Sequence, residues 1–145
     1  MAASITFYNN WKAAVNDAAV RAATIKVTLH ASTYTFAATH SVYADLTNEL
    51  STANGYTNGG ATLASLTFSQ TGGTATFDAA DTTWTASGGS IVARRAVIRV
   101  VGTINSQVDP LIASILLDTT PADVTTTTGN VLTLAWNASG IFTIA

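Results

Sequence analysis

Short stretches of alternating apolar and polar residues follow one another along most of this chain. Residues 24–30 alternate in this way, and residues 91–101 form the longest stretch. A period of two is typical of strands that bury one face. The dipeptides Asn54-Gly55 and Asn58-Gly59 lie between such stretches, and both residue types tolerate the positive φ angles of tight turns. The chain is therefore predicted to be mainly β, as an antiparallel β-sandwich or a distorted barrel.

The first part of the chain has a different period. Apolar residues recur there at spacings of three and four, namely Phe7, Trp11, Ala14, Val15, Ala18 and Ala19. This spacing predicts one N-terminal α-helix over about residues 4–23, packed on the sheet through Phe7, Trp11 and Val15. Strands are expected from about residue 24 to residue 144. The length of 145 residues matches one domain, so residues 1–145 are expected to form a single β-rich structural domain.

Further elements follow from local composition. Residues 31–43 are polar and aromatic, which predicts an irregular connection, and a short helical turn is expected near residues 42–46. The segment 70–73 ends in two glycines and predicts a hairpin. Residues 78–81 hold two aspartates, which are expected to accept backbone hydrogen bonds at a turn rather than to bind calcium or act as an acid–base pair.

The second half of the chain is predicted to hold the longest strands. Residues 91–101 are expected to form one strand whose even-numbered face is the more apolar. Residues 119–129 include four consecutive threonines and predict an exposed connection. A last pair of strands is expected at residues 131–136 and 140–144, on either side of a turn.

Charged residues are scarce for a chain of this size. Hydrophobic residues make up 48% of the sequence and charged residues only 10%, against roughly a quarter in ordinary soluble domains. With a formal net charge of −2, the basic surface of a nucleic-acid-binding protein is not expected. Because charge normally prevents strands from pairing edge to edge, permanent assembly is one expectation, and an unusually neutral monomer is the other.

The sequence also argues against several kinds of location and chemistry. No apolar run reaches the ~18 residues of a membrane span, and residues 1–5 do not resemble a secretory signal, so cytoplasmic synthesis without membrane association is expected. The chain has no cysteine. His30 and His40 lack a metal-ligand spacing, and no Gly-x-Ser-x-Gly motif occurs. We therefore expect no enzymatic activity, no cofactor and no metal.

Arg94 and Arg95 are neighbours in the predicted strand and must point to opposite faces. One of these two charged side chains must therefore lie on the more apolar face of the predicted strand. It could protect a strand edge or form an ion pair with Glu49 or Asp45. It could equally form a salt bridge between subunits.

Several segments together resemble a family of small tailed-bacteriophage proteins. They are residues 48–50 (Asn-Glu-Leu), 55–63, 81–84 (Asp-Thr-Thr-Trp), 91–97, 109–112 and 136–140, which span most of the chain. That family commonly shows a Glu before a Gly-Tyr-Thr-x-Gly-Gly run, a strand with Trp, and an Ala-Arg-x-Ala-Val strand. Many of its members have an aromatic residue where this chain has Arg95, so the local contact there does not carry over.

The resemblance implies a virion structural protein, assembled in the host cytoplasm. Its expected role is that of a capsid decoration, or cement, protein that binds and stabilises the outer shell, with the major capsid protein or other virion proteins as partners. A neck, tail or baseplate component is the alternative. A carbohydrate-binding module is a second alternative, which would need exposed aromatic platforms at Tyr34, Tyr43, Tyr56 or Trp84.

The contact surfaces are expected in loops on a rigid scaffold. The candidates are the Gly-rich loop at residues 54–60 and the Thr-rich loop at residues 123–129. With a mean hydropathy of +0.32, the chain is expected to form a homo-oligomer, either a trimer or a dimer. The predicted interface residues are Asn54, Gly55, Tyr56, Thr57, Asn58, Arg95, Thr125, Thr126 and Thr127.

Overall fold

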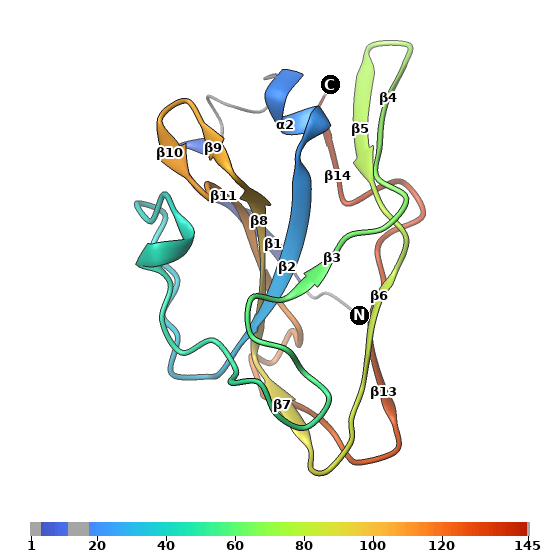
Figure 1. Ribbon diagram of the computed structural model, residues 1–145. Coiled ribbons are helices and arrows are strands. Elements are labelled where there is room, and N and C mark those ends of the chain that lie inside the picture. Colours follow the sequence, from blue (N-terminus) through green and yellow to red (C-terminus); the bar gives the residue numbers. More distant parts are fainter. Residues whose placement is uncertain (1–3, 12–17, 145) are drawn as a thin grey trace.

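The computed structural model describes residues 4–11 and 18–144. In this part of the chain, the first layer is a five-stranded antiparallel sheet (Figure 1). Its order is β1 (Ser4–Phe7), β11 (Leu111–Leu116), β8 (Arg95–Val101), β2 (Thr24–His30) and β3 (Ala61–Thr62). The central strands β2 and β8 pair along their full length, from Thr24 opposite Val101 to His30 opposite Arg95.

The second layer faces this sheet and consists of two consecutive pieces (Figure 1). The upper piece has β4 (Thr67–Thr71), β5 (Thr74–Asp78) and β14 (Phe142–Ile144), and the lower piece has β6 (Thr82–Thr85) and β13 (Val131–Leu134). Two short ribbons complete the described strands, β7 (Ile91–Ala93) with β12 (Val124–Thr126) and β9 (Thr103–Ile104) with β10 (Gln107–Val108). The predicted mainly β, antiparallel sandwich is confirmed, and the described strands do not close into a barrel.

The predicted helix over residues 4–23 is wrong at its start. Helix α2 (Ala18–Ala22) lies inside that range, but Ser4–Phe7 forms β1 and pairs with β11. Ile5 and Phe7 alternate with polar residues, so they also fit a strand, and pairing with a buried strand provides the backbone hydrogen bonds. Ala14 and Val15, which were assigned to the helix face, lie outside the described residues.

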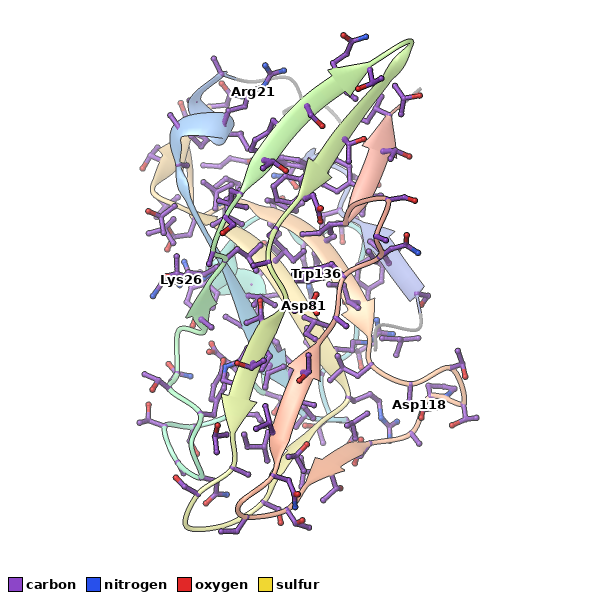
Figure 2. The ribbon with its side chains drawn as sticks, turned by 90° about the vertical axis from the view of Figure 1, so that its right-hand side faces the viewer. Arg21, Lys26, Asp81, Asp118 and Trp136 are labelled. Atoms are coloured by element: carbon purple, nitrogen blue, oxygen red, sulfur yellow. The ribbon has the colours of Figure 1, made fainter. Side chains whose placement is uncertain are left out.

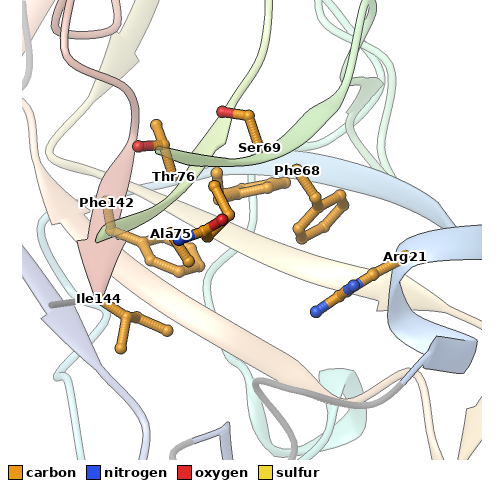
Figure 3. A pocket seen from close by; sticks show the side chains of 9 residues that line it. Arg21, Phe68, Ser69, Ala75, Thr76, Phe142 and Ile144 are labelled. Carbon is orange, nitrogen blue, oxygen red and sulfur yellow. The ribbon is translucent and has the colours of Figure 1, made fainter. Parts of the chain in front are cut away.

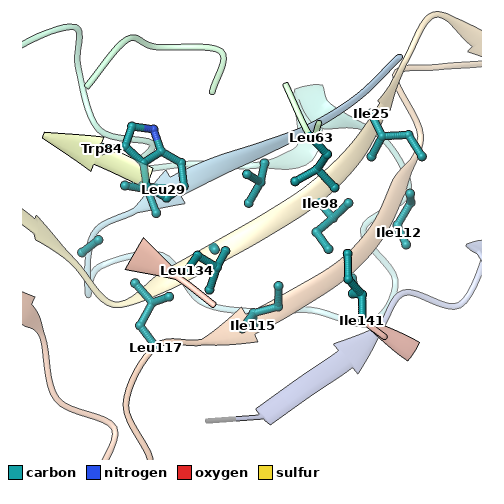
Figure 4. Close-up of a cluster of buried hydrophobic side chains, with 14 of the residues drawn as sticks. Ile25, Leu29, Leu63, Trp84, Ile98, Ile112, Ile115, Leu117, Leu134 and Ile141 are labelled. Atoms are coloured by element: carbon teal, nitrogen blue, oxygen red, sulfur yellow. The ribbon is translucent and has the colours of Figure 1, made fainter. Parts of the chain in front are cut away.

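The main core lies between the two layers, as Figure 4 shows. Trp11 is 3% exposed and meets the ring of Phe142 edge-on, with ring centroids 6.1 Å apart. Phe7 also contacts Phe142, at 5.1 Å, but from a strand rather than from a helix. The large fully buried aliphatic residues of this core come mostly from β2, β8 and β11, and include Ile25, Leu29, Ile98, Ile112 and Ile115.

The stretch 91–101 is broken at Arg94. The Arg94 N–H donates to the His30 carbonyl, and the Arg94 carbonyl accepts from the Leu117 N–H. This interruption reverses the alternation: odd-numbered residues of β7 point into the core, whereas even-numbered residues of β8 do so. The predicted even-numbered apolar face is therefore correct for β8 and wrong for β7.

The other face of the first layer is covered by the connection between β2 and β3. This connection is irregular, with the short 3-10 helix η1 (Tyr43–Asp45), as predicted. A second cluster lies beneath it, formed by Tyr8, Tyr34, Val97 and Leu111. The central sheet is consequently buried on both faces.

The end of the chain differs from the prediction in two ways. The connection 119–129 contains β12, which pairs with β7. Strands β13 and β14 do not pair with each other. Instead, β13 pairs with β6 and β14 pairs with β5, so both strands lie in the second layer. The Asp81 carboxylate accepts the Trp136 N–H at 2.9 Å and so joins the segment between β5 and β6 to the segment between β13 and β14. Figure 2 shows these two residues side by side. Asp78 accepts the Ala79 N–H, as the turn interpretation predicted.

Candidate interaction surface

Three loops meet at one end of the sandwich, at the bottom of Figure 1. They are residues 51–60, 86–90 and 127–130. The Ser87 N–H donates to the Asn54 carbonyl at 3.2 Å, and the Gly129 N–H donates to the Ala86 carbonyl at 2.8 Å. The two loops predicted to make contacts are therefore brought together across the loop 86–90. None of the three loops contains a charged residue, and we refer to them as the loop end.

Glu49 holds the longest of these loops in place. Its Oε1 accepts hydrogen bonds from the Tyr56 hydroxyl and from the Gly59 N–H, both at 2.6 Å, and its Oε2 accepts one from the Tyr43 hydroxyl. Arg99 holds Gly59 from the other side by donating to its carbonyl at 3.2 Å. Burial and the bond to Glu49 raise the pKa of Tyr43 to about 12, and the same two causes raise the pKa of Tyr56. Both hydroxyls therefore remain donors at neutral pH.

The Asn54-Gly55 turn is fixed by close packing. Asn54 and Gly55 have φ angles of 57° and 87°. A Cβ on Gly55 would lie 2.0 Å from the Thr85 carbonyl oxygen, so only glycine fits there. The Asn54 side chain donates to the Ser90 carbonyl at 2.9 Å. The loop end is consequently a preformed surface.

The structure separates the predicted interface residues of the first loop into two groups. Asn54, Gly55, Thr57 and Asn58 are exposed at the loop end. Tyr56 is only 2% exposed, because its hydroxyl reaches Glu49 and its ring packs near Trp84. The prediction that Tyr56 makes intermolecular contacts is therefore wrong, and Tyr56 supports the loop from beneath.

The second predicted loop divides in the same manner. Thr125 and Thr127 are exposed, whereas Thr126 is 8% exposed. Thr126 belongs to β12 and lies opposite Ile91, and this register turns its side chain inward. Thr126 is therefore not available as a contact residue.

A shallow groove of about 220 Å³ lies beside the loop end, and its walls include Leu50, Asn54 and Val92. Val92 is 41% exposed. The sequence prediction placed Val92 on the apolar face because it continued the alternation through Arg94. The interruption at Arg94 instead turns Val92 toward solvent, which adds an apolar residue to the candidate surface.

Arg95 lies on the face of the central sheet that carries the second cluster, beside Phe36. Its guanidinium stacks over the Phe36 ring at 5.8 Å and donates to the Ser114 hydroxyl at 3.3 Å. Arg94 forms an ion pair with Asp123 at 2.8 Å, and as a partly exposed pair it contributes little to stability.

The predicted ion-pair partners of these arginines, Glu49 and Asp45, are wrong, because Arg94 forms its ion pair with Asp123 instead. The carboxylate of Glu49 is occupied by tyrosine hydroxyls and a backbone N–H. The carboxylate of Asp45 accepts the Ser41 and Val42 N–H groups instead.

The aromatic platforms expected for sugar binding are mostly inaccessible. Tyr34, Tyr56 and Trp84 are 3%, 2% and 6% exposed, so their ring faces cannot stack on a ligand. Tyr43 is half-buried, and the guanidinium of Arg99 lies 4.0 Å from the centre of its ring. The expectation that these rings are exposed is therefore wrong.

His30 is fully buried beside Thr28. Since the Thr47 carbonyl can only accept, Nδ1 of His30 donates to it at 2.9 Å, and Nε2 accepts from the Thr28 hydroxyl. Burial lowers the pKa of His30, against smaller opposing effects of the Thr47 bond and of Glu49. Across residues 4–11 and 18–144, no three His, Cys, Asp or Glu side chains are grouped to hold a metal ion.

No helix in the described part of the chain is both long and apolar enough to span a membrane. Comparison of the chain with protein-family models, with curated proteins and with solved structures finds no match. The resemblance to small tailed-phage proteins therefore stays a prediction from the sequence motifs.

Proposed function

We propose that this chain is a non-catalytic structural protein of a tailed-bacteriophage virion, and that it decorates the capsid by binding the outer shell through its loop end. The observation that carries the proposal is the loop end itself, a preformed and uncharged surface of three interlocked loops. Burying such a surface against another protein leaves no charge without a partner, which removes a large cost of association.

The rigidity of the loop end supports the same proposal. Glu49 and the close approach of Gly55 to Thr85 fix the loop before any partner binds. A preformed surface loses little conformational entropy on binding. On a shell built from repeated subunits, several modest contacts by an oligomer also combine through effective concentration. The proposed partners are accordingly the major capsid protein or other virion proteins.

Copy number tests the location. Virions of the phage that encodes this chain would be purified, and the chain would be quantified against the major capsid protein by mass spectrometry. A decoration protein is expected in hundreds of copies per particle. About six or twelve copies would instead indicate the alternative, a neck, tail or baseplate component with the symmetry of the tail axis. Absence from purified virions would contradict both.

A further inference from the structure

Strand β4 (Thr67–Thr71) is a free edge of the second layer, and its β4–β5 hairpin projects beyond the first layer in Figure 1. The Phe77 carbonyl accepts the Ile141 N–H, so the backbone of Phe77 faces β14 rather than β4. In an antiparallel pair the bonding direction alternates along a strand. Because Phe68 lies opposite Phe77 and Gln70 opposite Ala75, the backbone groups of Phe68 and Gln70 point outward from the sheet. Within residues 4–11 and 18–144, these groups have no hydrogen-bond partner.

This edge carries none of the features that usually prevent strand pairing. Its sequence is Thr-Phe-Ser-Gln-Thr, with no charge and no proline, and its register with β5 is continuous. The turn that ends it has Gly72 at a φ of 61°, as in the two-residue turns that keep hairpins regular. A neutral edge of five residues in unbroken register is a template for another strand.

We infer that β4 pairs antiparallel with β4 of a second copy, around a two-fold axis at Ser69. In this register Phe68 lies opposite Gln70 of the other copy, so the outward-pointing backbone groups of both chains meet each other. Thr67 lies opposite Thr71, and Ser69 lies opposite itself. The result is one continuous six-stranded sheet, formed from β14, β5 and β4 of each copy.

The side chains suit this pairing. Ser69 lies opposite Thr76 on β5, and Figure 3 shows both side chains on the other side of the hairpin from the rings of Phe68 and Phe142. Hydroxyl groups would therefore meet on the outer face of the shared sheet. On the inner face, the half-buried Phe68 ring would gain cover from the aliphatic part of Gln70 of the second copy. Strand β4 carries no charged residue, so the two paired strands bring no like charges opposite each other.

The geometry favours a dimer over the trimer that the sequence left open. A two-fold contact uses the same edge of both copies, so it closes after two chains. This inference goes beyond the proposed binding of a shell, and it concerns a different part of the molecule from the loop end. Dimerisation is tested with the isolated protein, whereas binding to a shell is tested with shells, so either proposal can fail without the other.

Sedimentation equilibrium provides the first test. The wild-type protein is expected at twice its chain mass of 14.9 kDa at about 100 µM, a concentration at which micromolar dimers are well populated. Ser69→Lys places two ammonium groups opposite each other and should give the monomer mass. Thr143→Lys is the matched control, because it adds the same charge to an exposed position on β14, and it should remain dimeric. A monomeric or trimeric wild type, or a dimer that survives Ser69→Lys, would overturn the inference.

Cross-linking locates the axis. The chain has no cysteine, so S69C introduces a single thiol. Opposite residues at a non-hydrogen-bonded antiparallel position have Cα atoms roughly 4.5 Å apart, within the range of a disulfide. Mild oxidation should convert S69C to a disulfide-linked dimer, whereas T143C should stay largely uncross-linked. Equal cross-linking of the two variants would contradict an axis at Ser69.

Discussion

The Tyr56 hydroxyl connects the loop end to the central sheet through Glu49. It donates to the Glu49 carboxylate at 2.6 Å and accepts the Leu29 N–H at 3.1 Å. Leu29 belongs to β2, at the centre of the first layer. The position of the loop is therefore tied to the most buried part of the fold, and disturbing this one connection should loosen the surface that we propose to bind the shell.

Glu49→Gln should destabilise the protein and loosen the loop end. The amide carries no charge and its NH2 group cannot accept, so the Tyr43 hydroxyl must turn to accept from it, and the hydrogen bonds from Tyr56 and Gly59 become neutral ones. Because hydrogen bonds to a charged group contribute about 1.5–3 kcal/mol and neutral ones about 1 kcal/mol, a loss of about 1–3 kcal/mol is expected. Urea unfolding should show this loss, and hydrogen exchange should accelerate at residues 54–59. Asp123→Asn, which removes an exposed carboxylate, should cost less than about 1 kcal/mol. Equal effects of the two variants would show that Glu49 does not hold the loop.

Trp11→Ala should reduce the free energy of unfolding by about 3–5 kcal/mol, the usual cost of removing a buried aromatic side chain. Trp11 lies in the main core and contacts Phe142 of the second layer. The measurement is thermal unfolding followed by circular dichroism. An unchanged melting temperature would mean that this indole is not part of the core.

Gly55→Ala and Gly59→Ala form a matched pair. Both positions have a positive φ, at 87° and 94°, so both variants acquire backbone strain of order 1 kcal/mol. Only at Gly55 does the added methyl group meet a neighbour, the Thr85 carbonyl oxygen, whereas nothing lies within 4 Å at Gly59. Gly55→Ala should therefore have clearly the lower melting temperature. Equal melting temperatures would contradict the close approach of Gly55 to the Thr85 carbonyl.

The stability of the protein should fall as the pH is lowered from about 7 to 5. Burial holds the pKa of His30 below 6.5 in the folded state, so the unfolded chain binds its proton first. The stabilisation is thus complete above pH 6.5 and is lost as the pH falls toward the folded pKa, by up to about 1.4 kcal/mol per pH unit.

Urea midpoints at several pH values would measure this dependence. Asp45 and Asp118 have pKa values below 3.8, so their contributions disappear only in stronger acid. His30→Gln should flatten the profile between pH 7 and pH 5, even where it lowers stability overall. A wild-type profile that is flat in this range would refute the buried, neutral histidine.

Local patterns were sufficient to predict the sandwich, the turns and the hairpin at residues 70–73. They failed where long-range contacts decide the structure. The alternation through residues 91–101 is unbroken in sequence, yet Arg94 bonds to His30 at the end of β2 and to Leu117 just after β11, which reverses the faces and exposes Val92. Nothing in the local sequence signals those two partners.

Two of the residues predicted for the candidate surface, Tyr56 and Thr126, are buried. Tyr56 stands between two turn dipeptides, which are typical of exposed loops. Its burial depends on Glu49, seven residues earlier, whose carboxylate also binds Tyr43 and Gly59. The inward position of Thr126 depends on pairing with Ile91, which lies far away in the sequence. Sequence patterns locate such loops, but the tertiary partners decide which side chains reach the surface.

Binding to shells that lack this protein tests the central claim most directly. Thr57 and Thr128 are exposed at the loop end, so Thr57→Asp and Thr128→Asp should fold normally and place a charge in the proposed interface. Thr143→Asp adds the same charge to the distant β14. Co-sedimentation of the purified protein with shells should show binding by the wild type and by Thr143→Asp, and at least tenfold weaker binding by the loop-end double variant, a loss of about 1.4 kcal/mol or more. Wild-type binding by that double variant, or no binding by any form, would contradict the account.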